Sequence, residues 1–262
     1  RMLAWLADAA DLVEAFDRGD DVYKIMAAAI YNKKAEDVTK EERFVGKQTV
    51  LGCGYGMGAK RFQVQLKNFG VELDEKECQR IIDIYRTTYL DIPYLWYDAG
   101  DCLTAIMKDK DSKFGKDDLL AVEGHKGIRL PNGLYIKYPN LREQKVKIEA
   151  TKDNPAESYT EAIYDTKKGR TLMTTRIYGG KVIENVCQAL ARIVIGEQLL
   201  QVARKYKVVM TVHDAIGCIV PEEEVKQGMA YVEKCMKIRP TWAKDLPLDC
   251  EGGVGNSYGE CQ

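Results

Sequence analysis

Residues 207–220 constrain the fold of this chain more tightly than any other segment. Lys207–Val212 and Ala215–Val220 are two apolar runs rich in β-branched residues, and only His213 and Asp214 lie between them. Strands joined by two residues can pair only in the antiparallel sense, because a parallel connection needs a crossover of about a dozen residues. The pattern therefore predicts an antiparallel hairpin of buried strands with a carboxylate at its tip.

The first 110 residues have the patterns of helices. Asp20 and Asp21 precede an apolar-periodic run, where acids favour a helix N-terminus. Thr39, with Glu42 three residues later, is the pattern of a capping box, and it predicts a helix over residues 41–55.

Later residues combine strand and helix signals. Residues 111–180 contain loop-like stretches and two short strand patterns about Asn132-Gly133, a strong hairpin signal. Helical periodicity returns at 184–205. We therefore predict an α+β fold with a helical subdomain over 1–110, a mixed or β-rich insertion over 111–180, and a C-terminal portion with the hairpin over 181–262.

Composition excludes several classes of protein. With 45% hydrophobic and 30% charged residues the chain is typical of a globular protein, and no apolar run is long enough to cross a bilayer, so we expect no membrane partner. Eight scattered cysteines without a CxxC pair, and two histidines, disfavour a zinc site and favour a reducing, cytoplasmic setting. The net charge of −1 does not argue for nucleic acid.

A basic stretch nevertheless runs from residue 126 to residue 147. Six basic side chains stand there against one acid, Glu143: Lys126, Arg129, Lys137, Arg142, Lys145 and Lys147. Such a stretch can follow a phosphate backbone or simply form a solvated face.

The predicted helix over 41–55 carries an unusual face. Arg43, Lys47, Leu51 and Tyr55 recur every four residues and so share one side. Two cations, an apolar residue and an aromatic ring suit a nucleoside triphosphate, because cations hold phosphates and the other two meet sugar and base. The alternative is a solvated face that ends in a glycine-rich turn.

Two other sets of residues suit polynucleotide chemistry. Asp214 on a tight turn is a rigid mount for a Mg²⁺ ligand, although an aspartate in a turn is also common for purely structural reasons. Asn185, Gln188 and Arg192 share a helical face by their spacing, and amide groups can read the acceptors of the minor groove. The same face is also ordinary for an amphipathic helix.

The order and spacing of these blocks resemble family A (DNA polymerase I-like) DNA polymerases, in particular those of phages. Arg43-x3-Lys47-x7-Tyr55-Gly56 resembles motif B, His213-Asp214 resembles motif C, and the helix with Gln188 resembles a helix of the palm. The resemblance implies helical fingers followed by the C-terminal palm. Leu51 replaces the usual Phe or Tyr, and Ala215 replaces the usual Glu.

The resemblance also implies a role for each site residue. Arg43 and Lys47 would hold the triphosphate, with Tyr23 as a further phosphate contact, Leu51 near the sugar, and Lys47, His213 and Asp214 as the catalytic set. The residues implied to contact DNA are Tyr55, Gly56, Asn185, Gln188, Arg192 and His213. Asp214 would bind metal in a site for two Mg²⁺ ions.

The implied function is template-directed addition of dNTPs to the 3′-hydroxyl of a primer on a DNA template. Arg1 resembles the last residue of motif A, so we expect the motif A acid on an upstream polymerase segment and little activity without it. Two alternatives stay open: a non-catalytic nucleotide- or DNA-binding half of a split polymerase, and an enzyme like the single-subunit RNA polymerases.

Overall fold

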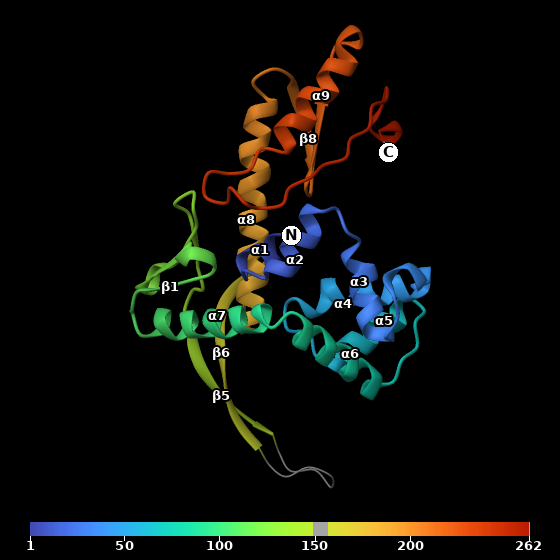
Figure 1. The fold of residues 1–262 in the computed structure, drawn as a ribbon. Helices are drawn as coiled ribbons and strands as arrows, with labels where there is room; N and C mark the ends of the chain where they lie inside the picture. The colour runs from blue at the N-terminus through green and yellow to red at the C-terminus, as the bar shows by residue number, and fades with distance from the viewer. Residues whose placement is uncertain (149–156, 262) are drawn as a thin grey trace.

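A helical first part precedes antiparallel sheets and two further helices, so the fold is of the mixed α+β kind (Figure 1). The computed structural model describes residues 1–148 and 157–261. Residues 149–156, within the segment predicted to be mixed or β-rich, lie outside the described part. The first helices are α1 (Met2–Leu6), α2 (Ala10–Asp17), α3 (Val22–Tyr31), α4 (Lys40–Cys53), α5 (Ala59–Asn68), α6 (Glu75–Thr88) and α7 (Asp91–Met107).

The capping box predicted for α4 is present, and Asp21, one of the acids expected before α3, is the N-cap of that helix. The Asp21 carboxylate accepts hydrogen bonds from the first N–H groups of α3. At α4 the Thr39 hydroxyl accepts from the Glu42 N–H at 3.2 Å, and the Glu42 carboxylate accepts from the Thr39 N–H at 3.0 Å. These bonds satisfy donors that a helix start leaves unpaired. The predicted C-terminal end of α4 was wrong, because the helix stops at Cys53 and not at Tyr55.

The described strands form three antiparallel sheets. The first has the order β1-β2-β3-β4 and consists of β1 (Ser112–Phe114), β2 (Leu120–Glu123), β3 (Gly127–Arg129) and β4 (Tyr135–Ile136). The predicted turn at Asn132-Gly133 joins β3 to β4, and Gly133 has the positive φ of 82° that this turn needs.

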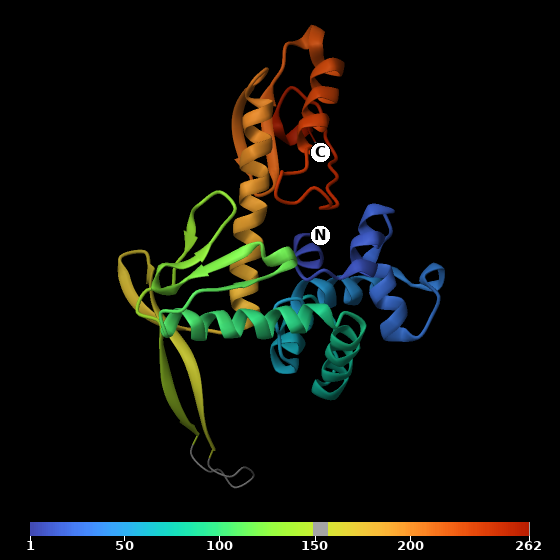
Figure 2. The ribbon, with the colours of Figure 1, turned by 60° about the vertical axis from the view of Figure 1, so that its left-hand side comes forward.

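The second sheet, of order β5-β6-β7, extends away from the rest of the chain (Figures 1 and 2). It consists of β5 (Arg142–Ile148), β6 (Glu157–Lys168) and β7 (Thr171–Ile177). The first half of β6 pairs with β5 and the second half with β7. At the base of this sheet the buried Ile177 leads directly into α8.

Helix α8 (Gly179–Val202) connects the elements of the second half of the chain. Figure 2 shows it running from α7 at one end to the third sheet and α9 (Val225–Met236) at the other. That sheet is the predicted hairpin, β8 (Lys207–Val212) paired with β9 (Ala215–Ile219). Within the described residues no helix combines the length and the apolar character needed to cross a membrane.

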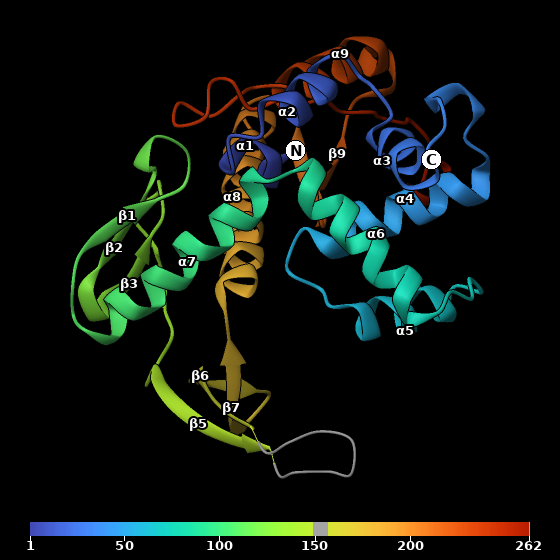
Figure 3. The same cartoon turned by 60° about the horizontal axis from the view of Figure 1, so that its bottom comes forward.

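Two hydrophobic cores organise the described residues. The first core is formed by helices α2, α3, α4, α5 and α6. The second core is formed by α1, α7, the first sheet and α8. The Trp96 side chain on α7 packs against both cores, and α7 leads from the helical part across α8 to β1 (Figure 3). The boundaries at residues 110 and 180 stay a prediction.

Candidate nucleotide and metal site

Helices α3 and α4 lie close enough for their backbones to touch. A Cβ atom added to Gly46 would clash with the Tyr23 carbonyl oxygen. This close approach brings Asp21, the N-cap of α3, beside Arg43 of α4, and the Arg43 Nε donates to Asp21 Oδ2 at 2.6 Å. The Arg43 guanidinium also lies 5.4 Å from the centroid of the Tyr23 ring, a cation–π arrangement.

The Asp21–Arg43 ion pair is partly exposed, and it lowers the pKa of Asp21. Partial burial by itself raises the pKa of the Asp21 carboxyl, but the bonds from Arg43 and from the first N–H groups of α3 outweigh it and leave that pKa below its usual value. The Arg43 side chain remains 40% exposed. The pair therefore orients Arg43 without burying it.

The outward face of α4 continues along the helix from Arg43. One turn on, Lys47 is exposed, and Leu51 after it is 50% exposed although it is apolar. The opposite face buries Val45 and Thr49 against the helical core. The predicted common side for Arg43, Lys47 and Leu51 is therefore present, with two cations next to an exposed apolar side chain.

Tyr55 does not continue this face. It lies in the turn after α4, where Gly56 takes a φ of 80°, and it packs half-buried against the second core. Burial first, and then the neighbouring Cys187 thiol, raise the pKa of the Tyr55 hydroxyl far above its usual value. The expected i, i+12 position was wrong because the helix ends at Cys53, and Tyr55 instead faces α8 from the end of α4.

The hairpin tip is exposed. His213, at a φ of 52°, and Asp214 connect Val212 to its partner Ala215, and both side chains are open to solvent. The expectation of buried strands was wrong, since Val209 is 50% and Ile219 is 59% exposed. Within the described residues this sheet consists of two strands, so each of them has a neighbouring strand on one side alone.

The hairpin tip offers one side chain, Asp214, that can serve as a ligand of a hard cation. Mg²⁺ prefers carboxylate oxygens, usually one or two of them together with water and substrate phosphates. Asp214 offers such a group in an accessible position. In the part of the chain that the structure describes, no three His, Cys, Asp or Glu side chains gather closely enough to hold a metal ion by themselves.

The predicted polar face of α8 is only partly outward. Gln188 and Arg192 are exposed, whereas Asn185 is half-buried and its Nδ2 donates to the Tyr138 hydroxyl at 3.2 Å. Tyr138 follows the first sheet and has its own edge-to-face partner in Tyr164, at 5.1 Å between ring centroids. No local sequence pattern predicts this contact, because 47 residues separate its partners.

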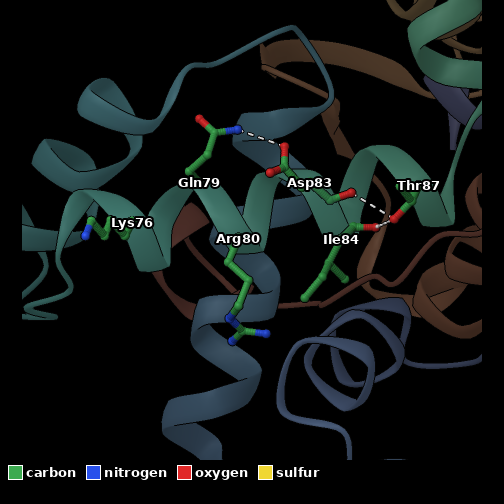
Figure 4. Close-up of a pocket in the computed structure, with 6 residues that line it drawn as sticks. All are labelled: Lys76, Gln79, Arg80, Asp83, Ile84 and Thr87. Atoms are coloured by element: carbon green, nitrogen blue, oxygen red, sulfur yellow. Dashed lines mark hydrogen bonds between the residues drawn. The ribbon is translucent and has the colours of Figure 1, made fainter.

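A groove of about 480 Å³ lies apart from these residues, on α6 (Figure 4). Its lining comes from one helix face: Lys76, Gln79, Arg80, Asp83, Ile84 and Thr87. Gln79 donates to Asp83 and Thr87 to the Asp83 carbonyl, whereas Arg80 donates to Glu77 and to the Ile30 carbonyl outside the lining. No second element supplies a converging group, so we assign no ligand to this groove.

Known proteins similar to this chain are DNA polymerases. Residues 1–99 match the family model described as DNA polymerase family A. The chain is 30% identical to the DNA polymerase of Bacillus phage SP02 over 98% of its length, and 22% identical to that of Bacillus phage SP01 over 95%. It spans 39% and 23% of those two proteins.

The fold has a solved counterpart as well. The POL domain of Pol1 from M. smegmatis, in complex with DNA primer-template and dNTP, superposes with a TM-score of 0.57 at 16% identity. The superposition covers 96% of this chain and 36% of the other, and at this identity it supports the fold alone. In sequence, residues 1–99 thus correspond to DNA polymerase family A, and nearly the whole chain is similar to the DNA polymerases of two phages.

Proposed function

We propose that this chain provides the nucleotide-binding helix and one metal-binding carboxylate of a template-directed DNA polymerase, which transfers dNTPs to the 3′-hydroxyl of a primer. The single observation that carries the proposal is the outward face of α4. Arg43 and Lys47 stand one helical turn apart, followed by the exposed Leu51. The relatives are DNA polymerases, which favours deoxynucleotides over ribonucleotides as substrates.

The two cations on α4 have different parts in binding the triphosphate. Arg43 is already oriented by Asp21 and by the Tyr23 ring, so its remaining N–H groups can donate to phosphate oxygens in a fixed direction. Lys47 is a mobile point charge that can follow the phosphates as negative charge moves toward pyrophosphate. Leu51 would contact the sugar, and Tyr55 would meet the base pair from the turn after α4.

In this proposal the hairpin tip supplies a metal-binding carboxylate and a contact to the primer. Asp214 would hold Mg²⁺ and His213 would contact the primer terminus, with Gln188 and Arg192 of α8 along the minor groove of the new duplex. Mg²⁺, when bound, polarises the phosphates and lowers the pKa of the attacking hydroxyl. Because a two-ion site needs carboxylates beyond Asp214, we propose that an upstream polymerase segment with the motif A acid completes it.

Primer extension with and without that segment tests this function. We expect the 262-residue chain alone to incorporate no measurable dNTP, and the chain mixed with an upstream segment carrying the acid to extend a primer in a Mg²⁺-dependent manner. Binding of primer-template by the chain alone should be weak and should fall steeply with salt, as for a few Lys and Arg contacts. Incorporation by the chain alone would contradict the assignment of the acids.

A non-catalytic role in binding nucleotide or DNA is the second candidate. The observation in its favour is that, within residues 1–148 and 157–261, no three His, Cys, Asp or Glu side chains lie close enough together to hold a metal ion. The same mixing experiment separates the two functions, because a binding module would retain DNA and nucleotide without extension under every combination.

A further inference from the structure

We infer that Trp96 and Arg86 are positioning residues, which lock the turn Gly54–Met57 to α6 and α7 so that α4 and Tyr55 present one fixed arrangement to the nucleotide. This inference rests on the function proposed for α4. Both side chains lie outside the segment that resembles motif B: Arg86 is on α6 and Trp96 is on α7.

Trp96 contributes a hydrogen bond to the end of α4. Its indole Nε1 donates to the Gly54 carbonyl oxygen at 2.9 Å, across 42 residues of sequence. Carbonyl groups at a helix C-terminus have no partner within the helix, so an N–H group from another element stabilises the helix end in one position. Trp96 itself is held between the two hydrophobic cores.

Arg86 contacts the other end of the same turn. Its Nη2 donates to the Met57 carbonyl oxygen at 3.4 Å, and its guanidinium lies 5.7 Å from the centroid of the Trp96 ring. A cation is favourable beside the C-terminus of α4, where the helix dipole is negative. The two side chains therefore support each other while each holds one carbonyl of the turn.

The Nε atom of Arg86 is buried under the turn. Among the described residues it is a buried side-chain nitrogen with no hydrogen-bond partner. A buried donor without a partner costs free energy, and arginine normally avoids this by reaching solvent. Arg86 stays under the turn because of its bond to Met57 and its contact with Trp96.

Glycines make the turn fit closely enough for these bonds to matter. A Cβ atom at Gly54 would lie 2.8 Å from the Leu3 Cδ2 atom and 3.3 Å from the Tyr85 hydroxyl. A Cβ atom at Gly180, at the start of α8, would lie 2.5 Å from the Tyr55 carbonyl oxygen. The turn is thus surrounded by α1, α6 and α8, with Trp96 and Arg86 as its polar attachments.

Hydrogen exchange of the chain tests the attachment without any reference to catalysis. We compare Trp96→Phe and Arg86→Met with two matched controls, Trp242→Phe, whose indole bonds to Glu197, and Arg80→Met, which lies in the groove of Figure 4. In the first two variants the Gly56 amide, which donates to the Cys53 carbonyl, should exchange about three to ten times faster. Neither control should change it.

Trp96→Phe keeps the packing of an aromatic ring, so it decides the outcome if Arg86→Met fails to fold. Unchanged exchange at Gly56 in a folded Trp96→Phe chain overturns the inference. This result does not depend on whether the chain takes part in DNA synthesis.

Kinetics of the enzyme completed with the upstream segment test the positioning role. We expect Trp96→Phe and Arg86→Met to raise KM for the correct dNTP about tenfold while the Kd for primer-template changes less than about twofold, and Arg86→Lys to recover part of the loss. A purely structural role would lower the active fraction, and hence kcat, with KM unchanged. Faster exchange with unchanged KM also overturns the inference, whereas a completed wild-type enzyme without incorporation contradicts the proposed function itself.

Discussion

Arg43 and Asp21 join the outward face of α4 to the first turn of α3, with 2.6 Å between Nε and Oδ2. Asp21 thereby does two things at once, since it also accepts hydrogen bonds from the Tyr23 and Lys24 N–H groups as the N-cap of α3. The orientation of a proposed phosphate-binding cation and the start of a neighbouring helix depend on the same carboxylate.

Replacement of that carboxylate by an amide separates the two roles. Asp21→Asn keeps a good N-cap and removes the charge opposite Arg43. Because the pair is partly exposed, we expect a loss of at most about 1 kcal/mol in the free energy of unfolding at pH 7. The pKa of the Asp21 carboxyl is lowered in the folded state, so the advantage of the wild type is present above the unfolded value of 3.8 and disappears as pH falls through the folded value. Urea denaturation at pH 7 and at pH 3 measures this, and an advantage that grows toward low pH contradicts the assignment.

The contact between α3 and α4 can be tested at Gly46. Gly46→Ala places a Cβ atom against the Tyr23 carbonyl oxygen, which belongs to the backbone and cannot rotate away. We expect a loss of about 1–3 kcal/mol in the free energy of unfolding, as for other overpacked sites. Gly196→Ala in α8 is the matched control, because no atom lies within 4 Å of its added Cβ, and it should stabilise the chain by about 0.5–1 kcal/mol. Equal effects of the two variants would show that the helices are not in close contact.

These two contacts illustrate which features the sequence predicts. The hairpin at His213-Asp214, the capping box at Thr39 and the Asn132-Gly133 turn depend on residues within a few positions of one another, and the structure confirms them. The pairing of Arg43 with Asp21 depends on how two helices pack, which no local pattern contains.

Longer-range effects also explain the incorrect predictions. Spacing alone placed Tyr55 on the face of α4, but α4 stops at Cys53. The turn that carries Tyr55 packs closely on α8, since a Cβ atom at Gly180 would lie 2.5 Å from the Tyr55 carbonyl oxygen. The strands of the hairpin looked buried because they are apolar, yet burial depends on what covers a sheet. Asn185 looked like a base-reading amide, and its bond to Tyr138 joins two segments 47 residues apart that no local pattern connects.

Lys47 should matter for incorporation and not for folding. Its side chain is exposed, so we expect Lys47→Met to change the free energy of unfolding by no more than about 0.5 kcal/mol. In the completed enzyme it should lower the rate of dNTP incorporation about 100-fold, the usual scale for loss of one group that stabilises transition-state charge. Lys40→Met, at the start of the same helix, controls for loss of a positive charge. Equal rates for the two variants would remove Lys47 from the triphosphate site.

The Tyr138 hydroxyl should orient Asn185. Tyr138→Phe removes the oxygen that accepts from the Asn185 Nδ2 and retains the ring that packs on Tyr164. We expect a loss of about 1 kcal/mol in the free energy of unfolding, together with a shift of the Asn185 side-chain amide resonances in NMR spectra. Tyr159→Phe, at an exposed position of β6, should do neither. Unaltered Asn185 resonances in Tyr138→Phe would contradict this contact.

Asp214 is the residue on which the proposed chemistry depends most directly. The decisive measurement is Mg²⁺-dependent primer extension by the chain completed with its upstream segment, with Asp214→Asn compared with Asp98→Asn, an exposed aspartate of α7. We predict that Asp214→Asn reduces extension to background while the Kd for primer-template stays within about twofold, because the amide keeps the turn and loses the charge that binds the ion. Asp98→Asn should extend primers like the wild type. Extension by Asp214→Asn at the wild-type rate would contradict the assignment of the metal site, and with it the proposed mechanism.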